Sequence, residues 1–367
     1  MKIAILTTGG VDPSGVHVVP CLLWLIAQLT QCGDEVHIFA MCGGGEGRWD
    51  MLGATVHNAG PRCAGRMFRL AWQEHRRAPF DVVQSLWSLR AHLVAAAMRL
   101  FLKVPMLFYV GGGELCAIAD VGYGGGLTVK SRLMIAVAMK VADCVAGQSA
   151  PVVAQFAARH RQARRLCLGV ALEHWPVAAP RSRGHALRLL HVAATVPFKD
   201  HDMMLATACH LKALGVPFRL DLLGRDISGD GRIEVSVAAL GLSGLVQVHG
   251  VLAHCHTRIF HEQADILVVT SRFEAGPLVA LEAALAGAAV VGTNVGHLAE
   301  WTPDAAAVVE PRDSEGLARV IAALYDNEDH RLRLAASAQA RALAETADVT
   351  VRKFRAVYAG LAAGPAV

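Results

Sequence analysis

Residues 266–282 read Ile-Leu-Val-Val-Thr-Ser-Arg-Phe-Glu-Ala-Gly-Pro-Leu-Val-Ala-Leu-Glu, and their pattern indicates a strand, a turn and a helix in succession. The apolar run at residues 266–270 predicts a buried strand, and the alanine- and leucine-rich run at 280–289 predicts a helix. Strand and helix patterns alternate in the same way along the rest of the chain. Such alternation favours parallel sheets with crossover helices. We therefore expect an α/β protein built from two Rossmann-like halves.

The junction between this strand and this helix is suited to binding phosphate. Gly276 and Pro277 lie there, and proline is favoured at the first helical position, where its missing N–H is no loss. The amides of Leu278 and Val279 would then form the positive end of the helix, which binds phosphate readily. The sequence therefore predicts a phosphorylated ligand at this turn.

Two carboxylates, Glu274 and Glu282, stand on either side of the same turn. We expect Glu274 at the carboxyl edge of the sheet and Glu282 on the helix, within reach of a ligand's sugar hydroxyls. One carboxylate would face the reacting centre and the other the ribose. The plain alternative is an ordinary βα unit with two solvated glutamates, because α/β folds reuse such turns for many purposes.

These motifs resemble a known family. The Glu-x7-Glu spacing, the Ser-x-x-Glu lead-in from Ser271 and the Leu-Glu-Ala-x-x-x-Gly from Leu281 look like the signature of retaining, nucleotide-sugar-dependent glycosyltransferases of family 4. The resemblance implies the GT-B fold, with two Rossmann-like domains whose parallel sheets face an interdomain cleft. In that family the first glutamate sits beside the donor sugar and the second binds the nucleotide ribose, which assigns Glu274 and Glu282 to those roles.

The resemblance also implies the chemistry and the partners. We expect transfer of a sugar from a nucleoside diphosphate sugar to the hydroxyl of a carbohydrate or lipid-linked acceptor, in polysaccharide or glycolipid synthesis. No cofactor and no metal are expected, because family 4 enzymes are generally metal-independent. In the front-face mechanism proposed for the family, a phosphate oxygen of the donor helps to take the acceptor proton.

The domain boundary is predicted from a change in composition. The periodic pattern lapses around residues 168–176, and residues 177–184 are small, prolyl and basic. We place the linker there. The predicted domains are an acceptor domain at 1–176, completed by a C-terminal helix at about 347–363, and a donor domain at 185–346.

Further donor-binding candidates lie in the second domain. Lys199 follows the predicted strand 187–192, and the resemblance places it on the donor diphosphate, where an ammonium offsets the charge of the leaving nucleotide. Gly224 and Arg225 follow the next predicted strand and are expected at the donor as well. Many family members have an arginine where this chain has Ala194. The plain alternative for Lys199 is a solvated surface lysine.

The first domain adds three candidates. Gly9 and Gly10 lie in a glycine-rich loop after the first strand, where doubly wound sheets bind ligands, and we expect them to close over the donor. Glu114 is the second catalytic candidate, because it could align an acceptor hydroxyl. The family commonly has a histidine where this chain reads Val110-Gly111. The glycines of residues 111–126 indicate either an acceptor loop that orders on binding or a flexible surface excursion.

Composition excludes several classes of function. The 367 residues are 54% hydrophobic and 18% charged, with a mean hydropathy of +0.39, which provides material for two cores. A net charge of +4 is too small to argue for nucleic acid, and no aromatic-basic stripe is present. The nine scattered cysteines indicate reduced thiols. We expect a cytoplasmic protein without a spanning helix.

The arginine-rich segment 62–77 indicates a solvated helix face or, as the alternative, peripheral contact with the inner membrane face.

Four histidines lie within residues 249–261, together with Cys255, and one interpretation of such a cluster is a metal site. We expect exposed histidines instead, because a strand ending near His249 and a helix starting near Thr257 would scatter the side chains that zinc requires to converge.

Two rival functions stay open from the sequence. A non-catalytic GT-B protein that binds nucleotide or glycan, or that acts as a scaffold of a polysaccharide-synthesis complex, is motivated by the missing arginine and histidine. A GT-B sugar-nucleotide epimerase would need no acceptor pocket. A nicotinamide dehydrogenase is disfavoured, because residues 9–15 do not follow the Gly-x-Gly-x-x-Gly spacing.

Overall fold

The computed structural model describes residues 1–13, 18–43, 46–160, 162–175, 177–224 and 231–364. The chain forms two compact units. Unit 1 comprises Met1–Gly169 and Ala347–Val367, and unit 2 comprises Val170–Thr346. Each unit has its own sheet, and both sheets are mainly parallel, as the alternating sequence pattern predicts.

Unit 1 contains an eight-stranded sheet in the order β3-β4-β2-β1-β5-β6-β7-β8. All neighbouring strands are parallel except β3 and β4, which form an antiparallel pair. Strands β1, β5 and β6 are wholly buried, as expected for parallel strands covered on both faces. The strands are β1 (Lys2–Thr7), β2 (Glu35–Ala40), β3 (Gly47–Met51), β4 (Ala54–Asn58), β5 (Val82–Leu86), β6 (Met106–Val110), β7 (Cys144–Gly147) and β8 (Ala163–Arg165).

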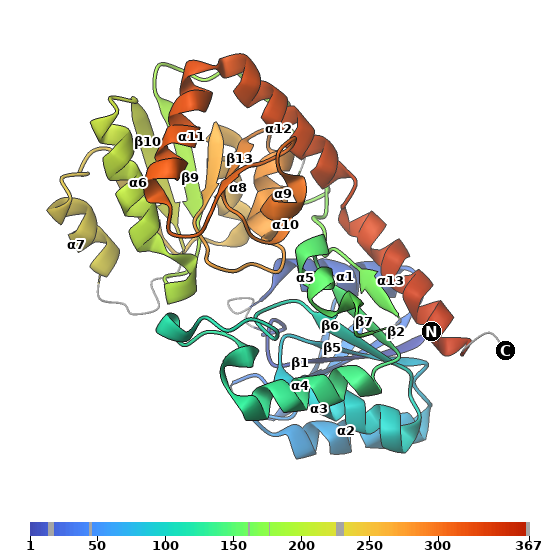
Figure 1. Cartoon of the computed structure of the whole chain (residues 1–367). Coiled ribbons are helices and arrows are strands. Elements are labelled where there is room, and N and C mark those ends of the chain that lie inside the picture. The colour runs from blue at the N-terminus through green and yellow to red at the C-terminus, as the bar shows by residue number, and fades with distance from the viewer. Residues whose placement is uncertain (14–17, 44–45, 161, 176, 225–230, 365–367) are drawn as a thin grey trace. The chain divides into compact units, whose positions relative to one another are not determined.

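The helices of unit 1 cover both faces of this sheet. Helices α2, α3 and α4 follow one another along one face, whereas α1 and α13 pack together on the other (Figure 1). The hydroxyl of Tyr358 on α13 donates to the side chain of Gln84 on β5, which fastens the last helix to the sheet. The helices are α1 (Pro20–Gln31), α2 (Ala64–Arg77), α3 (Leu89–Ala97), η1 (Met98–Leu102), η2 (Ala119–Val121), η3 (Gly125–Leu127), α4 (Val129–Val141), α5 (Ala150–Ala157) and α13 (Ala347–Ala362).

Unit 2 contains a six-stranded parallel sheet in the order β11-β10-β9-β12-β13-β14. The chain builds β9, β10 and β11 outward in one direction and then adds β12 on the opposite side of β9. The strand order therefore reverses between β9 and β12, and such a switch point is where open α/β sheets bind ligands. The strands are β9 (Leu187–Val192), β10 (Phe218–Leu223), β11 (Val246–Gly250), β12 (Ile266–Val269), β13 (Ala289–Thr293) and β14 (Ala307–Val309).

The helices of unit 2 again lie on both faces of the sheet. Helices α6 and α11 pack against each other on one face, and α9 and α12 on the other (Figure 1). Leucine, isoleucine and valine side chains of the strands fill the core between α6, α11 and the sheet. The helices are η4 (Pro197–Lys199), α6 (His201–Ala213), α7 (Arg232–Ala239), α8 (His254–Gln263), α9 (Leu278–Leu285), α10 (Gly296–Trp301), α11 (Ser314–Asp326) and α12 (Glu328–Leu343).

The hairpin of β3 and β4 is an element that the sequence pattern did not predict. Strand β3 lies at the edge of the sheet and is largely exposed, so its residues carry no clear apolar alternation. Its partner β4 is buried at four of five positions. An edge strand of this kind is defined by its neighbour rather than by its own sequence.

Candidate functional site

The predicted donor-binding residues of unit 2 lie along the carboxyl edge of its sheet. Lys199 follows β9, Gly224 follows β10 and Glu274 follows β12. The hydroxyl of Thr270 donates to the carbonyl oxygen of Lys199 at 2.9 Å and thereby ties the β12 loop to the β9 loop. The fold therefore brings these segments together at the switch point between β9 and β12.

Lys199 and Glu274 form an ion pair at this edge. Nζ of Lys199 contacts Oε1 of Glu274, and the hydroxyl of Ser271 donates to the same carboxylate oxygen at 2.7 Å. The two charged side chains are only 21% and 12% exposed, so water and salt screen the pair less than a surface pair. Lys199 is thus not a freely solvated lysine, and two predicted site residues are in direct contact.

Helix α9 begins beside Glu274, with one correction to the prediction. Pro277 has φ −66° and ψ 114°, so it is the N-cap and not the first helical residue. A proline suits either position because only its φ is fixed, and the extended ψ could not be foreseen from residue type. Leu278 and Val279 are the first two helical residues, and their amides have no acceptor within the helix. Gly276 immediately precedes the N-cap.

Glu282 lies on α9 and is 4% exposed. Nε2 of His254 donates to its Oε1 at 2.5 Å, and Nε2 of His261 lies 3.8 Å from its Oε2. The ring of Trp175 lies 5.1 Å from each of the two imidazoles, and its Nε1 donates to the carbonyl oxygen of Glu282 at 2.8 Å. Glu282 is therefore held in a cage of one indole and two imidazoles.

The prediction that the histidines of residues 249–261 are exposed is wrong for part of the set. His261 is fully buried, and burial lowers its pKa to about 4. His249 is 17% exposed and pairs with Asp221 at 2.6 Å. Helix α8 begins at His254, before the predicted start, so His254 and His261 lie two turns apart on one face. Only these two face Glu282.

Gly224 is required by the close approach of two backbones. It has φ +149°, and a Cβ at this position would lie 1.8 Å from the carbonyl oxygen of Ala193. Its amide donates to the carbonyl oxygen of Gly250 at 2.9 Å. The loop that follows β10 is thus fixed at its first residue. Arg225, the neighbouring donor-binding candidate, lies outside the described residues.

Gly9 and Gly10 follow β1 in unit 1. The hydroxyl of Thr7 donates to the carbonyl oxygen of Gly9 at 2.8 Å, and the amide of Gly9 lies 3.3 Å from the same hydroxyl. The carbonyl oxygen of Gly10 accepts from the amide of Val19, just before α1, at 3.2 Å. The loop therefore starts at the carboxyl edge of its sheet, as predicted for a ligand-binding loop of this fold class.

Glu114 in unit 1 faces a histidine that the sequence analysis did not single out. Its Oε2 accepts from the amide of Gly112 at 2.8 Å, and Nε2 of the fully buried His92 lies 3.6 Å from its Oε1. Within the described part of the chain, neither of these two facing atoms has a hydrogen-bond partner. Ser85 Oγ, 2.8 Å from Nδ1, and the stacked ring of Phe108 hold the imidazole.

Glu114 also borders a cavity of about 460 Å³. Some of the glycine-rich residues 111–126 form part of its wall. Ile118 and Tyr123 exchange backbone hydrogen bonds of 2.8 and 3.1 Å. Gly124 has φ +119°, and a Cβ there would lie 2.1 Å from the carbonyl oxygen of Cys116. Glycine is thus needed for packing. The cavity is lined by Trp87, Ser88, Leu89, Gly112, Gly113, Glu114, Tyr123, Gly124, Gly125, Ser131 and Ile135.

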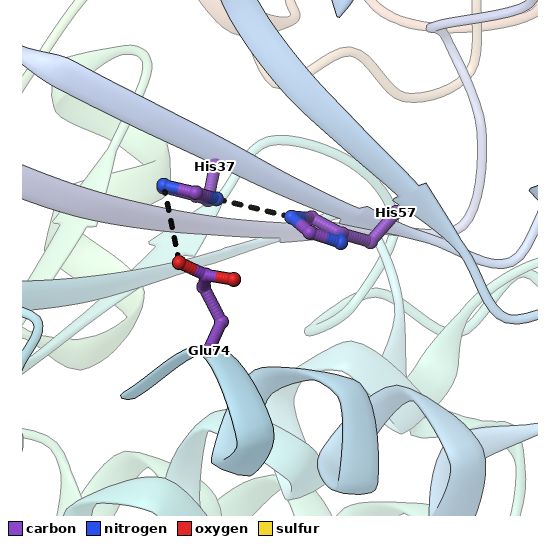
Figure 2. Close-up of side chains that lie close together, drawn as sticks. All are labelled: His37, His57 and Glu74. Carbon is purple, nitrogen blue, oxygen red and sulfur yellow. Dashed lines mark hydrogen bonds and ion pairs between the residues drawn. The ribbon is translucent and has the colours of Figure 1, made fainter. Parts of the chain in front are cut away.

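One group of potential metal ligands occurs among the described residues. The ligand atoms of His37, His57 and Glu74 lie within 4.8 Å of one another (Figure 2). Nδ1 of His37 and Nε2 of His57 share a hydrogen bond of 3.0 Å, while Lys2 and Arg77 contact the carboxylate of Glu74 at 2.9 and 3.1 Å. A bound cation would have to displace both an ammonium and this hydrogen bond. We therefore interpret the group as a network that joins β1, β2, β4 and α2.

Helix α4 exposes apolar side chains to solvent. Val129, Leu133 and Val137 are each at least half exposed and recur every four residues. The helix carries Lys130, Arg132 and Lys140 and no acidic residue. It borders a second cavity of about 820 Å³, on the side of α5. No helix in the described part of the chain is long and apolar enough to cross a bilayer.

Helix α2, which forms most of the arginine-rich segment, buries one narrow face against unit 1 and leaves the rest of its surface partly or fully exposed. Met67 and Ala71 are buried, and the guanidinium of Arg76 lies 5.4 Å from the centre of the half-exposed Trp72 ring. This arrangement fits a core-packing helix with a solvated arginine face, which is the first of the two predicted alternatives.

Part of the chain is similar to a known family of proteins. Residues 179–341 match the family "Glycosyl transferases group 1". Glycogen synthase of Mycobacterium tuberculosis (strain ATCC 25618 / H37Rv) is 30% identical over 175 residues, which are 47% of this chain and 42% of that protein. D-inositol 3-phosphate glycosyltransferase of Streptosporangium roseum is 30% identical over 182 residues, 47% of this chain and 42% of that protein. The chain thus matches less than half of the length of these relatives.

Several solved structures have a similar fold, and the similarity extends over both units. Sucrose-phosphate synthase from Thermosynechococcus elongatus has a TM-score of 0.81 at 19% identity, with 99% of each chain covered. HepE of Anabaena in complex with UDP-glucose has a TM-score of 0.75 at 16% identity, covering 98% of this chain and 100% of that chain. The predicted GT-B fold is confirmed by these neighbours.

Proposed function

We propose that the protein is a retaining glycosyltransferase of family 4 that moves a sugar from a nucleoside diphosphate sugar to an acceptor hydroxyl. The observation that carries the proposal is the contact between Lys199 and Glu274, with Ser271 on the same carboxylate, at the switch point of the second sheet. A cation and a carboxylate held side by side at the start of α9 suit a ligand that has both phosphate and hydroxyl groups.

The roles on the donor side follow from charge and position. Lys199 and the amides of Leu278 and Val279 would bind the diphosphate, because they provide positive charge where the leaving group develops negative charge. Glu274 would accept hydrogen bonds from the sugar, and Glu282 from the ribose. Gly224 would let the backbone after β10 approach the donor.

The reaction needs no protein base on the face that the acceptor attacks. The bond between the anomeric carbon and the diphosphate oxygen breaks, and the acceptor oxygen forms a bond on the same face. The acceptor proton passes to the departing diphosphate oxygen, so charges and atoms balance. The protein would contribute positioning and stabilisation of the diphosphate.

The acceptor would bind in unit 1. Glu114 borders a cavity of about 460 Å³. The fully buried His92 does not line this cavity, but its Nε2 lies 3.6 Å from Oε1 of Glu114 and could orient that carboxylate toward a hydroxyl. A lipid-linked acceptor, as used in polysaccharide or glycolipid synthesis, is supported by the exposed apolar and basic face of α4, which suits an anionic membrane surface.

Calorimetry with a panel of sugar nucleotides, combined with an assay of slow donor hydrolysis without acceptor, tests the proposal. We expect saturable binding of one donor and hydrolysis that is lost in Glu274→Ala. Glu282→Ala should weaken donor binding, whereas Glu274→Ala should chiefly lower turnover. If both variants have the same kinetics as wild type, the roles assigned to Glu274 and Glu282 are wrong. If no donor binds to wild type, the proposed function is refuted.

A non-catalytic nucleotide or glycan binder is the second candidate. It is favoured by Ala194 and Gly111, which stand where many family members have an arginine and a histidine. Donor binding without hydrolysis, and without transfer to any acceptor in a glycan and lipid-linked glycan panel, would support this candidate.

A further inference from the structure

We propose that His254 is a positioning residue for the nucleotide ribose, because its imidazole holds the carboxylate of Glu282 in the orientation that accepts hydrogen bonds from ribose hydroxyls. The inference rests on the proposed function, which takes Glu282 as the ribose ligand. It adds a residue outside the glutamate motif, since His254 is the first residue of α8 and Glu282 lies on α9.

The hydrogen-bond chemistry fixes the direction of this contact. A carboxylate only accepts, so the 2.5 Å bond requires the hydrogen on Nε2 of His254. This bond occupies one lone pair of Oε1 and leaves the others for a ligand. The histidine side chain is 34% exposed and that of Glu282 only 6%, so the imidazole is the more accessible of the two bonded groups. A ribose hydroxyl that reaches Glu282 would therefore lie beside the imidazole.

The surroundings make the arrangement rigid. The ring of Trp175 is tilted by 31° against His254 and is itself fixed by its bond to the Glu282 carbonyl. Fully buried His261 closes the other side of the carboxylate, and neither of its ring nitrogens has a hydrogen-bond partner in the described part of the chain. Of the two imidazoles, His254 alone lies within hydrogen-bond distance of the carboxylate.

The effect of losing His254 follows from side-chain ordering. A diol bound by one carboxylate needs that carboxylate in a single rotamer. If His254 does not hold it, the ligand must order it on binding, which weakens affinity by about 2- to 12-fold. The weakening should affect only ligands that have ribose hydroxyls.

The test uses the full chain and calorimetry with UDP, ADP and GDP, each compared with its 2′,3′-dideoxy counterpart. For the nucleotide that binds, wild type should prefer the ribose form by about tenfold or more. His254→Ala should weaken the binding of the ribose form by about 2- to 12-fold and leave that of the dideoxy form unchanged. His254→Gln should restore part of the preference, because its amide can donate to the carboxylate. His256→Ala, at an exposed histidine of the same helix, is the matched control and should change neither ligand.

Each other outcome overturns the inference in a recognisable way. Equal weakening of both ligand forms would mean a structural role, and tighter binding of the ribose form would mean that His254 blocks the site. An unchanged preference would mean that Glu282 needs no support. In a Glu282→Ala background, His254→Ala should have no further effect on the preference. If no nucleotide binds wild type, the proposed function itself fails and this inference falls with it.

Discussion

Replacing His261 by leucine should make unit 2 less sensitive to acid. The imidazole is fully buried, and burial lowers its pKa from 6.5 to about 4. A group whose pKa is lower in the folded state is protonated first in the unfolded state. Its contribution to stability is therefore complete above about pH 6.5 and is lost as the pH falls toward 4.

The magnitude follows from the two pKa values. At pH 5 about 97% of the unfolded histidine carries a proton, against about 9% of the buried one, which costs about 2 kcal/mol relative to pH 8. Leucine has a similar volume and no proton to bind, and His261 makes no hydrogen bond in the described structure that leucine would lose. The variant should match wild type within about 1 kcal/mol at pH 8. It should lose about 2 kcal/mol less than wild type on going to pH 5.

The assay has to report on unit 2 alone, because the two units need not unfold together. Amide hydrogen exchange of β9 and β12 between pH 8 and pH 5, corrected for the intrinsic exchange rate at each pH, gives the local free energy of opening. His256→Leu, at an exposed position of the same helix, should leave the pH dependence unchanged. If wild type and His261→Leu lose the same free energy over this range, the imidazole is not held neutral by burial and the reasoning is refuted.

Three further changes test the donor edge and the packing of the fold. Lys199→Met should weaken nucleoside diphosphate binding at least tenfold by calorimetry, because the diphosphate loses a charged donor; unchanged affinity would remove Lys199 from the site. Gly224→Ala should destabilise unit 2 by about 2 kcal/mol or more, because the added Cβ would clash with the carbonyl oxygen of Ala193. Unaltered protection of the β9 and β10 amides from hydrogen exchange would contradict this prediction. Tyr358→Phe should lower the stability of unit 1 by about 1–3 kcal/mol, because it leaves the buried oxygen of Gln84 unpaired. Amide hydrogen exchange of β1 and β5 measures this loss, and unaltered protection there would count against the prediction.

The sequence predicts strands better than helix starts, for a physical reason. Strand β9 begins and ends at the predicted residues, because its mostly apolar and buried run stands out from its flanks. The start of α9 depends on the ψ angle of Pro277, which residue type does not fix. Strand β3 escapes prediction because it is exposed and depends on its partner β4.

The positions of single site residues could be predicted from local sequence, whereas the contacts between them depend on tertiary packing. The placement of Glu274 after β12 follows from a motif within one strand-turn-helix segment. Its contact with Lys199 joins residues 75 positions apart, and the contact between His254 and Glu282 joins residues 28 apart. His92 reaches Glu114 from a helix whose inward face the sequence does not reveal, because its apolar and small residues surround the whole helix. Such pairs depend on how layers pack and not on spacing.

Under the proposed function, the ion pair of Lys199 and Glu274 would explain how one lysine serves the donor in a chain that has Ala194 where many family members have an arginine. A diphosphate carries more negative charge than one carboxylate, so a donor that reaches the edge should attract the ammonium toward its phosphates. Glu274 keeps its bond from Ser271 and would be released toward the sugar hydroxyls. Both groups are already charged, partly buried and in place before the donor arrives. Binding would therefore exchange one acceptor for another at Lys199 and would not require a new charge to be buried, which lowers the cost of organising the site.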